Sequence, residues 1–220
     1  MSSVYEINPP QIPKQLNTIQ IEILDPEELY EMLSVSGARL DEQSAARLLC
    51  EQVSFKRCTF NRAKLHKLRL FDCRFNECDL SQTEIEAARL VRVSFKGCRL
   101  IGLQGFVAEL GDVRFQDCNL EGAIFSSAKF KRVRFEGCML RNAFLDQVDL
   151  TNVVFDDCDL SGASLHGATL TGADLRGSKL DRVQAEAQDL KGAIIDPRQA
   201  VQVAELLGLK VCEPGESLEE

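Results

Sequence analysis

The chain has 220 residues, a formal net charge of −8, 45% hydrophobic residues and no tryptophan. This length suits one domain with small caps at its ends. No stretch approaches the roughly 18 apolar residues of a membrane-spanning helix, and residues 1–20 lack a basic region followed by an apolar run, as a secretory signal would have. We therefore expect a cytoplasmic protein with no membrane association.

Residues 1–36 are predicted to form an N-terminal arm and a helical cap. Three prolines, Pro9, Pro10 and Pro13, indicate an extended arm over residues 1–17. Residues 25–33 have a helix-start signal, because Asp25 is a suitable N-cap and Pro26 suits the first helical position.

A five-residue period runs through residues 37–197. Every fifth position from Leu40 carries a large apolar residue, except at Ala45, Cys50, Gly105 and Ala185. A small or β-branched residue comes two positions earlier. This period fits neither an α-helix nor a plain strand, but it fits a chain that bends every five residues.

A second period of twenty residues indicates that four such segments close one coil. Two columns repeat at this spacing: Phe55, Phe75, Phe95, Phe115, Phe135 and Phe155, and Cys58, Cys78, Cys98, Cys118, Cys138 and Cys158. Each residue would then stack on its equivalent one coil away, at the sheet spacing of about 4.8 Å. We predict that both columns are core ladders of an all-β solenoid.

The clearest repeats are residues 163–167 (ASLHG), 168–172 (ATLTG) and 173–177 (ADLRG). They resemble the pentapeptide-repeat family. The resemblance implies a right-handed quadrilateral parallel β-helix of about eight 20-residue coils, with a layout similar to that of the quinolone-resistance pentapeptide proteins. The glycines at the fifth positions, such as Gly167 and Gly172, are expected at corners.

The cysteines are predicted to be packing residues. Six of the nine occupy one inward column, where a thiol behaves as a small hydrophobe. Disulfides between coils and metal binding are the less favoured interpretations, because a reducing compartment opposes the first and a linear column does not converge on a metal.

Residues 198–212 are predicted to form a C-terminal helix and a short strand. Asp196 is the expected N-cap, Pro197 the first helical residue and Gln199 the partner in a capping box, while Leu209 and Val211 are expected in the strand. An apolar face with Val201, Ala204, Leu206 and Leu207 would cap the solenoid. The family resemblance also implies a two-fold dimer through this segment. Residues 213–220 are expected to be a disordered acidic tail.

No catalytic, metal or cofactor site is predicted. His66 and His166 are the only histidines, and they lie five coils apart. No catalytic triad pattern, phosphate-binding loop or dinucleotide fingerprint is present in the sequence. We therefore expect a protein that is not an enzyme.

Two outer surfaces are candidate interaction sites. The first is an acidic face made of Asp117, Glu136, Asp156, Asp157, Asp159 and Asp174. The second is an apolar patch made of Ile101, Phe106, Ile124, Met139 and Phe144. A solvated face is the alternative for the first. For the second, the N-terminal arm could cover the patch, or Phe106 could turn inward over Gly105. Phe71 and Val91 form another apolar column that could seat the N-terminal segment.

These surfaces favour a rigid scaffold that binds an unidentified protein. The alternative comes from the resemblance: a DNA mimic that protects or inhibits the type II topoisomerases DNA gyrase and topoisomerase IV through the acidic face. Residues 51–100 carry a net charge of +5, which a full-length duplex mimic would avoid. Direct nucleic-acid binding is disfavoured, because these basic residues spread around all four faces without aromatic residues for base stacking.

Overall fold

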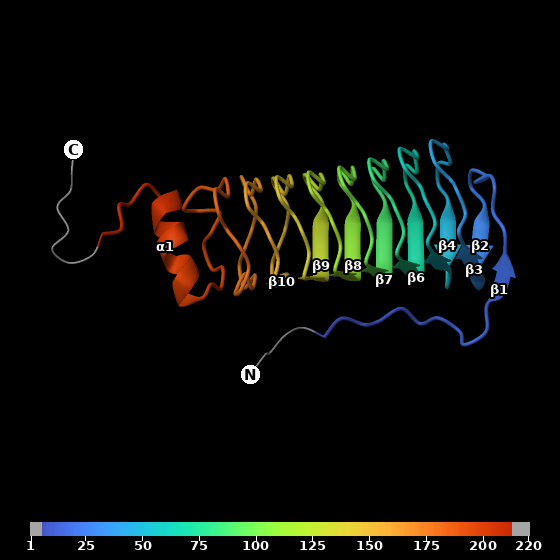
Figure 1. The fold of residues 1–220 in the computed structure, drawn as a ribbon, viewed down its shortest axis with the longest axis horizontal. Helices are drawn as coiled ribbons and strands as arrows, with labels where there is room; N and C mark the ends of the chain where they lie inside the picture. The colour runs from blue at the N-terminus through green and yellow to red at the C-terminus, as the bar shows by residue number, and fades with distance from the viewer. Residues whose placement is uncertain (1–5, 213–220) are drawn as a thin grey trace.

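The computed structural model describes residues 6–212. They form a straight rod of stacked coils with a helix at its C-terminal end and an extended N-terminal arm alongside (Figure 1). The elements are β1 (Asn17–Ile19), β2 (Leu29–Glu31), β3 (Leu33–Ser36), β4 (Leu49–Glu51), β5 (Ser54–Lys56), β6 (Arg69–Asn76), β7 (Arg89–Lys96), β8 (Glu109–Gln116), β9 (Lys129–Glu136), β10 (Val154–Asp156) and α1 (Pro197–Leu206).

The strands confirm the twenty-residue period. All of them pair in parallel in one sheet, and from β2 onward each pairing joins residues twenty apart, such as Phe75 with Phe95. The stacking path from β1 to β10 makes about seven turns. Bridges from Val154 to Asp174 and from Asp174 to Ile194 continue the same register. The fold is therefore the predicted parallel β-solenoid.

Each coil has four faces. The first face contains the Phe55 ladder, the second the Cys58 ladder, the third Leu65 and Ile85, and the fourth Leu70 and Leu90. The eight-residue strands β6 to β9 cross from the fourth face to the first. Isolated bridges join the coils on the second and third faces. The hydrogen bonding is thus most continuous around the corner between the fourth and first faces.

Corners fall at every fifth residue from Glu27 to Arg182, in the left-handed conformation. Asp72, Arg92 and Asp112 have φ of 53°, 52° and 56°, and Gly167 and Gly172 have φ of 67° and 70°. Glycine adopts this conformation without strain, whereas other residues cost about 1–2 kcal/mol there. The stacked coils therefore impose the corner conformation even where the residue disfavours it.

The interior consists of the predicted ladders. Successive rings from Phe55 to Phe155 stack with centroids 4.8–5.0 Å apart. The six ladder cysteines are buried and unpaired as thiols, and each donates its S–H to a backbone carbonyl, as Cys98 does to the oxygen of Phe75 at 3.4 Å. Ser178 continues this column and donates to the oxygen of Phe155 at 3.1 Å. A small side chain with one donor therefore suffices at this position.

The helix expected at residues 25–33 is wrong. This segment forms a turn and strands β2 and β3, and Glu27 is a left-handed corner with φ of 65°. β2 pairs with β4, and β3 pairs with both β1 and β5. Pairing with the next coil satisfies the backbone groups of a strand edge that a helix would leave open, so it outweighs the local helix-start signal.

The C-terminal helix forms as predicted and closes the rod. Asp196 caps α1, and the capping box with Gln199 is complete. Gln199 is buried, and its Nε2 donates to the carbonyl oxygens of Leu175 at 2.6 Å and Ser178 at 2.7 Å. The strand expected at Leu209 and Val211 does not form within residues 6–212. The predicted acidic tail, residues 213–220, lies outside the described residues.

The corner conformation predicts a contrast between two glycine substitutions. Gly177 has φ of 77°, and nothing lies within 4 Å of a Cβ built there, so Gly177→Ala introduces backbone strain without a clash. We expect this change to lower the free energy of unfolding by about 1 kcal/mol, measured by urea denaturation. The control is Gly111→Ala on β8, where the nearest atom would be 3.9 Å away and φ is not left-handed. It should be neutral or stabilising. Equal effects of the two changes would contradict this account.

Candidate functional site

Arginine side chains lie between the carboxylates of the predicted acidic face. Glu136, Asp156 and Asp174 lie on the first face. Glu136 accepts from Arg114 Nε at 2.8 Å, and Arg134 bridges it to Asp156, at 2.6 Å from Glu136 and 3.3 Å from Asp156. These contacts join neighbouring outward columns of the first face.

The other acidic residues have different surroundings. Asp174 pairs with Arg176 at 2.6 Å. Asp159 lies on the second face and is largely buried; burial raises its pKa, but Ser161 and Arg141 outweigh burial and hold the pKa below its ordinary range.

Two members of the acidic face remain without an ion pair in the described part of the chain. They are Asp117 and Asp157, both at the corner between the first and second faces and two coils apart. A DNA duplex carries one negative charge per about 1.7 Å of its axis. Two unpaired carboxylates separated by two coils, or about 10 Å, form a much sparser pattern than the duplex.

The predicted apolar patch is only partly contiguous. Ile124 and Phe144 are ladder partners on the third face, and Phe106 lies on the same face. Met139 and Ile101 are on the second face, across a corner. Phe144 is 47% exposed, Met139 43% and Phe106 39%, while Ile124 and Ile101 are half-buried. Ile124 and Phe144 therefore form the centre of the patch.

Neither alternative explanation of the patch holds in the structure. Phe106 does not turn inward over Gly105, because a Cβ at Gly105 would lie only 2.9 Å from Cδ1 of Phe125. The ring of Phe125 thus fills that space. The described part of the N-terminal arm docks at the corner between the fourth and first faces, diagonally opposite the corner next to Ile124 and Phe144.

A polar hollow of about 620 Å³ adjoins the patch. Its lining is Glu121, Arg141, Asn142, Ser161, Gly162, Asp181, Arg182 and Gln184. Protein interfaces combine an apolar centre with a polar, solvent-accessible rim. The Ile124–Phe144 centre and this hollow have that arrangement.

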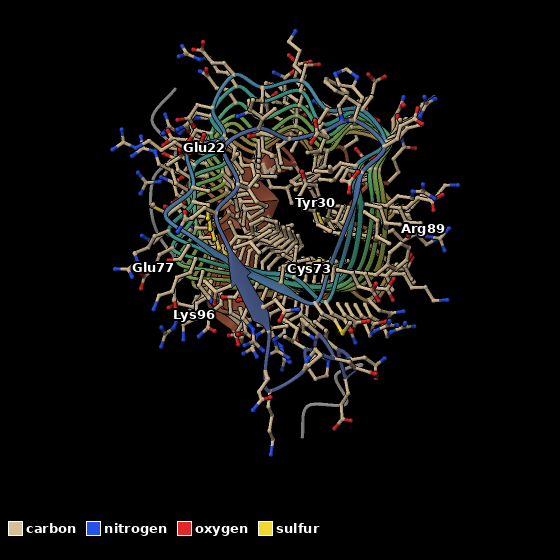
Figure 2. All side chains as sticks on the ribbon, turned by 90° about the vertical axis from the view of Figure 1, so that its right-hand side faces the viewer. Glu22, Tyr30, Cys73, Glu77, Arg89 and Lys96 are labelled. Carbon is tan, nitrogen blue, oxygen red and sulfur yellow. The ribbon has the colours of Figure 1, made fainter. Side chains whose placement is uncertain are left out.

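The arm reveals a polar site that the sequence analysis did not identify. Asp72 and Asp112 are each only 5% exposed. The Asn8 N–H donates to Asp112 Oδ1 at 3.1 Å, and the Gln11 N–H donates to Asp72 Oδ1 at 2.8 Å. In Figure 2, which looks along the rod, the arm lies outside the face that carries Cys73. Ile7, Pro9 and Pro10 lie beside residues of the first face, such as Arg74 and Lys96, and the expected seat at Phe71 and Val91 stays a prediction.

Each of these aspartates is also held by an arginine one coil further on. Arg92 binds Asp72 through Nε at 2.7 Å and Nη2 at 2.6 Å, and Arg132 binds Asp112 in the same two-pronged way. The Arg132 guanidinium and the Asn8 N–H hold the pKa of Asp112 below its ordinary range despite burial. Burial raises the pKa of Asp72, but Arg92 and the Gln11 N–H outweigh it and lower the pKa. The sequence contains a signal for this polar site. Aspartate and arginine alternate there every twenty residues, at Asp72, Arg92, Asp112 and Arg132.

The histidines and cysteines occupy separate environments. His66 contacts Glu84 on the next coil at 3.0 Å and Glu86 at 3.3 Å, while His166 lies five coils away and is exposed. Burial raises the pKa of the Cys73 thiol to about 12. Among residues 6–212, no group of three or more His, Cys, Asp or Glu side chains is arranged to hold a metal ion. No helix in that range is long and apolar enough to cross a membrane.

Some of the predicted C-terminal contact residues pack against the rod, and others are exposed to solvent. Leu206 packs against the solenoid core and Ala204 is half-buried. Val201 and Leu207 are exposed, as are Ile194, Leu209 and Val211. The C-terminal end therefore presents apolar side chains beyond those that cap the rod.

Family models match most of the rod. A model described as a pentapeptide repeat region matches residues 50–125, and a model of pentapeptide repeats matches residues 108–147 and 145–182. The chain belongs to the pentapeptide-repeat family. No curated protein matched in a search of characterised sequences.

Solved structures with a similar fold include two named proteins. One is a trypsin-treated variant of QnrB1, a plasmid-mediated fluoroquinolone resistance protein: it is 22% identical, the match covers 90% of this chain and 98% of that one, and the TM-score is 0.47. The other is HetL, involved in heterocyst differentiation regulation in the cyanobacterium Nostoc sp. strain PCC 7120: it is 19% identical, with 79% and 89% covered and a TM-score of 0.47.

Proposed function

We propose that this protein is a non-catalytic scaffold that binds another protein through the apolar patch centred on Ile124 and Phe144. The observation that carries the proposal is the exposed Phe144 side chain at a normally polar outward position, on a face that no described segment covers. Exposed apolar groups of this kind mark contact sites.

The rod supports such a role by its rigidity. Ile124 and Phe144 are fixed by backbone pairing to adjacent coils, so ordering the patch costs little entropy on binding. The cytoplasm is the proposed location, because eight of the nine free cysteines are buried as thiols in the packed interior, and thiols persist in reducing compartments.

Substitution of the central aromatic residue tests the patch. Phe144→Asp removes a contact and places a charge in the interface, so we expect partner affinity to fall by about thirtyfold, or ~2 kcal/mol. The measurement is capture of the partner on immobilised protein, followed by titration calorimetry with that partner.

The matched control is Ile23→Asp, at a 69% exposed isoleucine in the first coil, far from the patch; this variant should bind like the wild-type protein. Circular dichroism establishes that each variant is folded. Undiminished binding by both Phe144→Asp and Ile124→Asp would refute the patch assignment.

The alternative is a DNA mimic that acts on DNA gyrase or topoisomerase IV. In its favour are the fluoroquinolone-resistance role of QnrB1, whose solved structure this fold resembles, and the exposed pair Asp117 and Asp157. The arginines that neutralise Glu136, Asp156 and Asp174 weigh against it.

A gyrase supercoiling assay, with and without a quinolone, separates these functions. For the scaffold function we expect no change in supercoiling and no protection from the drug at micromolar protein. Protection that is lost in Asp156→Asn/Asp157→Asn would establish the mimic instead. The control Glu28→Gln/Glu31→Gln makes the same charge change on the first coil.

We also propose that two copies associate through the exposed C-terminal end. Burial of Val201 and Leu207 against their counterparts would remove apolar surface from water. Light scattering after size-exclusion chromatography should give twice the chain mass, and Leu207→Glu should give the monomer mass. Ile23→Glu, at the opposite end of the rod, should remain dimeric. A wild-type monomer at high concentration would exclude this association.

A further inference from the structure

The N-terminal arm docks on a column of charged corner residues. This column, at the junction of the fourth and first faces, contains Asp72, Arg92, Asp112 and Arg132 in consecutive coils. The arm runs along it toward the C-terminal end as the residue number falls: Gln11 bonds to Asp72 and Asn8 to Asp112. The Gln52 side-chain amide donates to the Gln11 carbonyl at 3.1 Å. Figure 1 shows the arm beside the rod.

The spacing of the arm matches the spacing of the coils. Gln11 is three positions after Asn8, and an extended polyproline segment rises about 3.1 Å per residue, which gives about 9.3 Å. Two coils separate Asp112 from Asp72, which at about 4.8 Å per coil gives about 9.6 Å. One turn of a polyproline helix therefore fits two coils of the rod.

The hydrogen-bond donors of the arm match the same pattern. Pro9 and Pro10 have no N–H, so between Asn8 and Gln11 the backbone offers donors only at its two ends. The coil between the two acceptor aspartates presents Arg92, which is itself a donor. A residue with a free N–H in the middle of the segment would face a cation instead of an acceptor.

The two acceptors are built into the rod. Each aspartate is buried and fixed by two bonds from its arginine, yet an oxygen of each still accepts a backbone N–H from the arm. The Gln11 contact comes from the main chain alone, whereas at Asn8 the side-chain Nδ2 also donates to Asp112 Oδ1 at 3.1 Å, beside the backbone N–H. An extended segment with backbone donors at positions i and i+3 and prolines between them meets the main-chain requirement, and an asparagine at position i adds the side-chain bond.

The arm itself is loosely held. None of the residues from Glu6 to Leu16 is buried. A cavity of about 250 Å³ remains between the arm and the first face, with Ile7, Pro9 and Pro10 on one side and Arg74, Lys96 and Arg114 among the residues on the other. Segments with few buried contacts open at low free-energy cost, so the arm can leave the rod easily. A segment with a larger side chain at the position of Ile7 would also fill this cavity.

We propose that the Asp72–Asp112 corner is a binding site for an extended x-Pro-Pro-x segment of a partner protein, and that residues 8–11 occupy it in the free protein as a displaceable internal ligand. The tether gives the arm a high effective concentration, so the site is closed to weak ligands and opens to a segment that binds better. This site is separate from the Ile124–Phe144 patch, and the proposal does not depend on that patch.

The test uses a full-length variant whose arm cannot dock. Asn8→Pro/Gln11→Pro removes both backbone donors, together with the Asn8 side-chain donor, and leaves every rod residue unchanged. The probe is a fluorescent peptide of residues 6–14, and the measurement is fluorescence anisotropy. We expect the peptide to bind this variant about three- to tenfold more tightly than the wild-type protein, because the tethered arm no longer competes. Circular dichroism establishes that the rod is intact.

Two controls address the arm and the donor spacing. Lys14→Pro/Gln15→Pro adds two prolines outside the docked segment and should bind the peptide as weakly as the wild-type protein does. A peptide in which both Pro9 and Pro10 are replaced by alanine places extra N–H groups opposite Arg92 and should bind the freed variant several-fold more weakly. Equal affinity for the freed variant and the wild-type protein, no binding at millimolar peptide, or equal binding of the alanine peptide would each overturn the proposal.

Discussion

The structure depends on the parallel hydrogen bonding of each coil to the next at a fixed separation of twenty residues. This register places every inward side chain on its equivalent, which is why the phenylalanine rings stack 4.8–5.0 Å apart, close to the strand spacing itself. A slip by one residue would turn the inward set outward. The same register aligns outward residues in columns, so the apolar patch, the interleaved charges and the corner that receives the arm all follow from it.

Constant separation also explains why so much of this fold could be predicted. The partner of Phe95 is Phe115 because all such partners are twenty positions apart, and the corner glycines follow from the same count. The prediction failed at residues 25–33, where Asp25 and Pro26 gave a local helix signal. The competing contribution, pairing of Leu29 with Leu49 and of Val35 with Phe55, depends on neighbours that a local signal does not include.

The surfaces were harder to predict, for a related reason. The repeat predicted that Glu136 and Asp156 share a column, and the pairing of β9 with β10 confirms this alignment. Their partners Arg114 and Arg134, however, lie 22 residues away, in a different column. The carboxylates of Asp72 and Asp112 form a binding site only together with the arm. The arm residues that contact them are 61 and 104 residues away in the sequence. No repeat connects the arm to the rod, so periodicity gives no information about where it docks.

The closing of the rod by Gln199 has a consequence for how such molecules change size. Its Nε2 donates to the carbonyls of Leu175 and Ser178, 24 and 21 residues before it, and its Oε1 accepts from the N–H of Asp196 in the capping box. The bonds of this amide to the rod therefore involve the terminal coil alone. A duplication or deletion of one whole coil elsewhere would leave that contact intact and change the length by about 4.8 Å. The cap therefore does not fix the length of the rod. The number of coils can change by whole coils while the contacts at both ends stay the same.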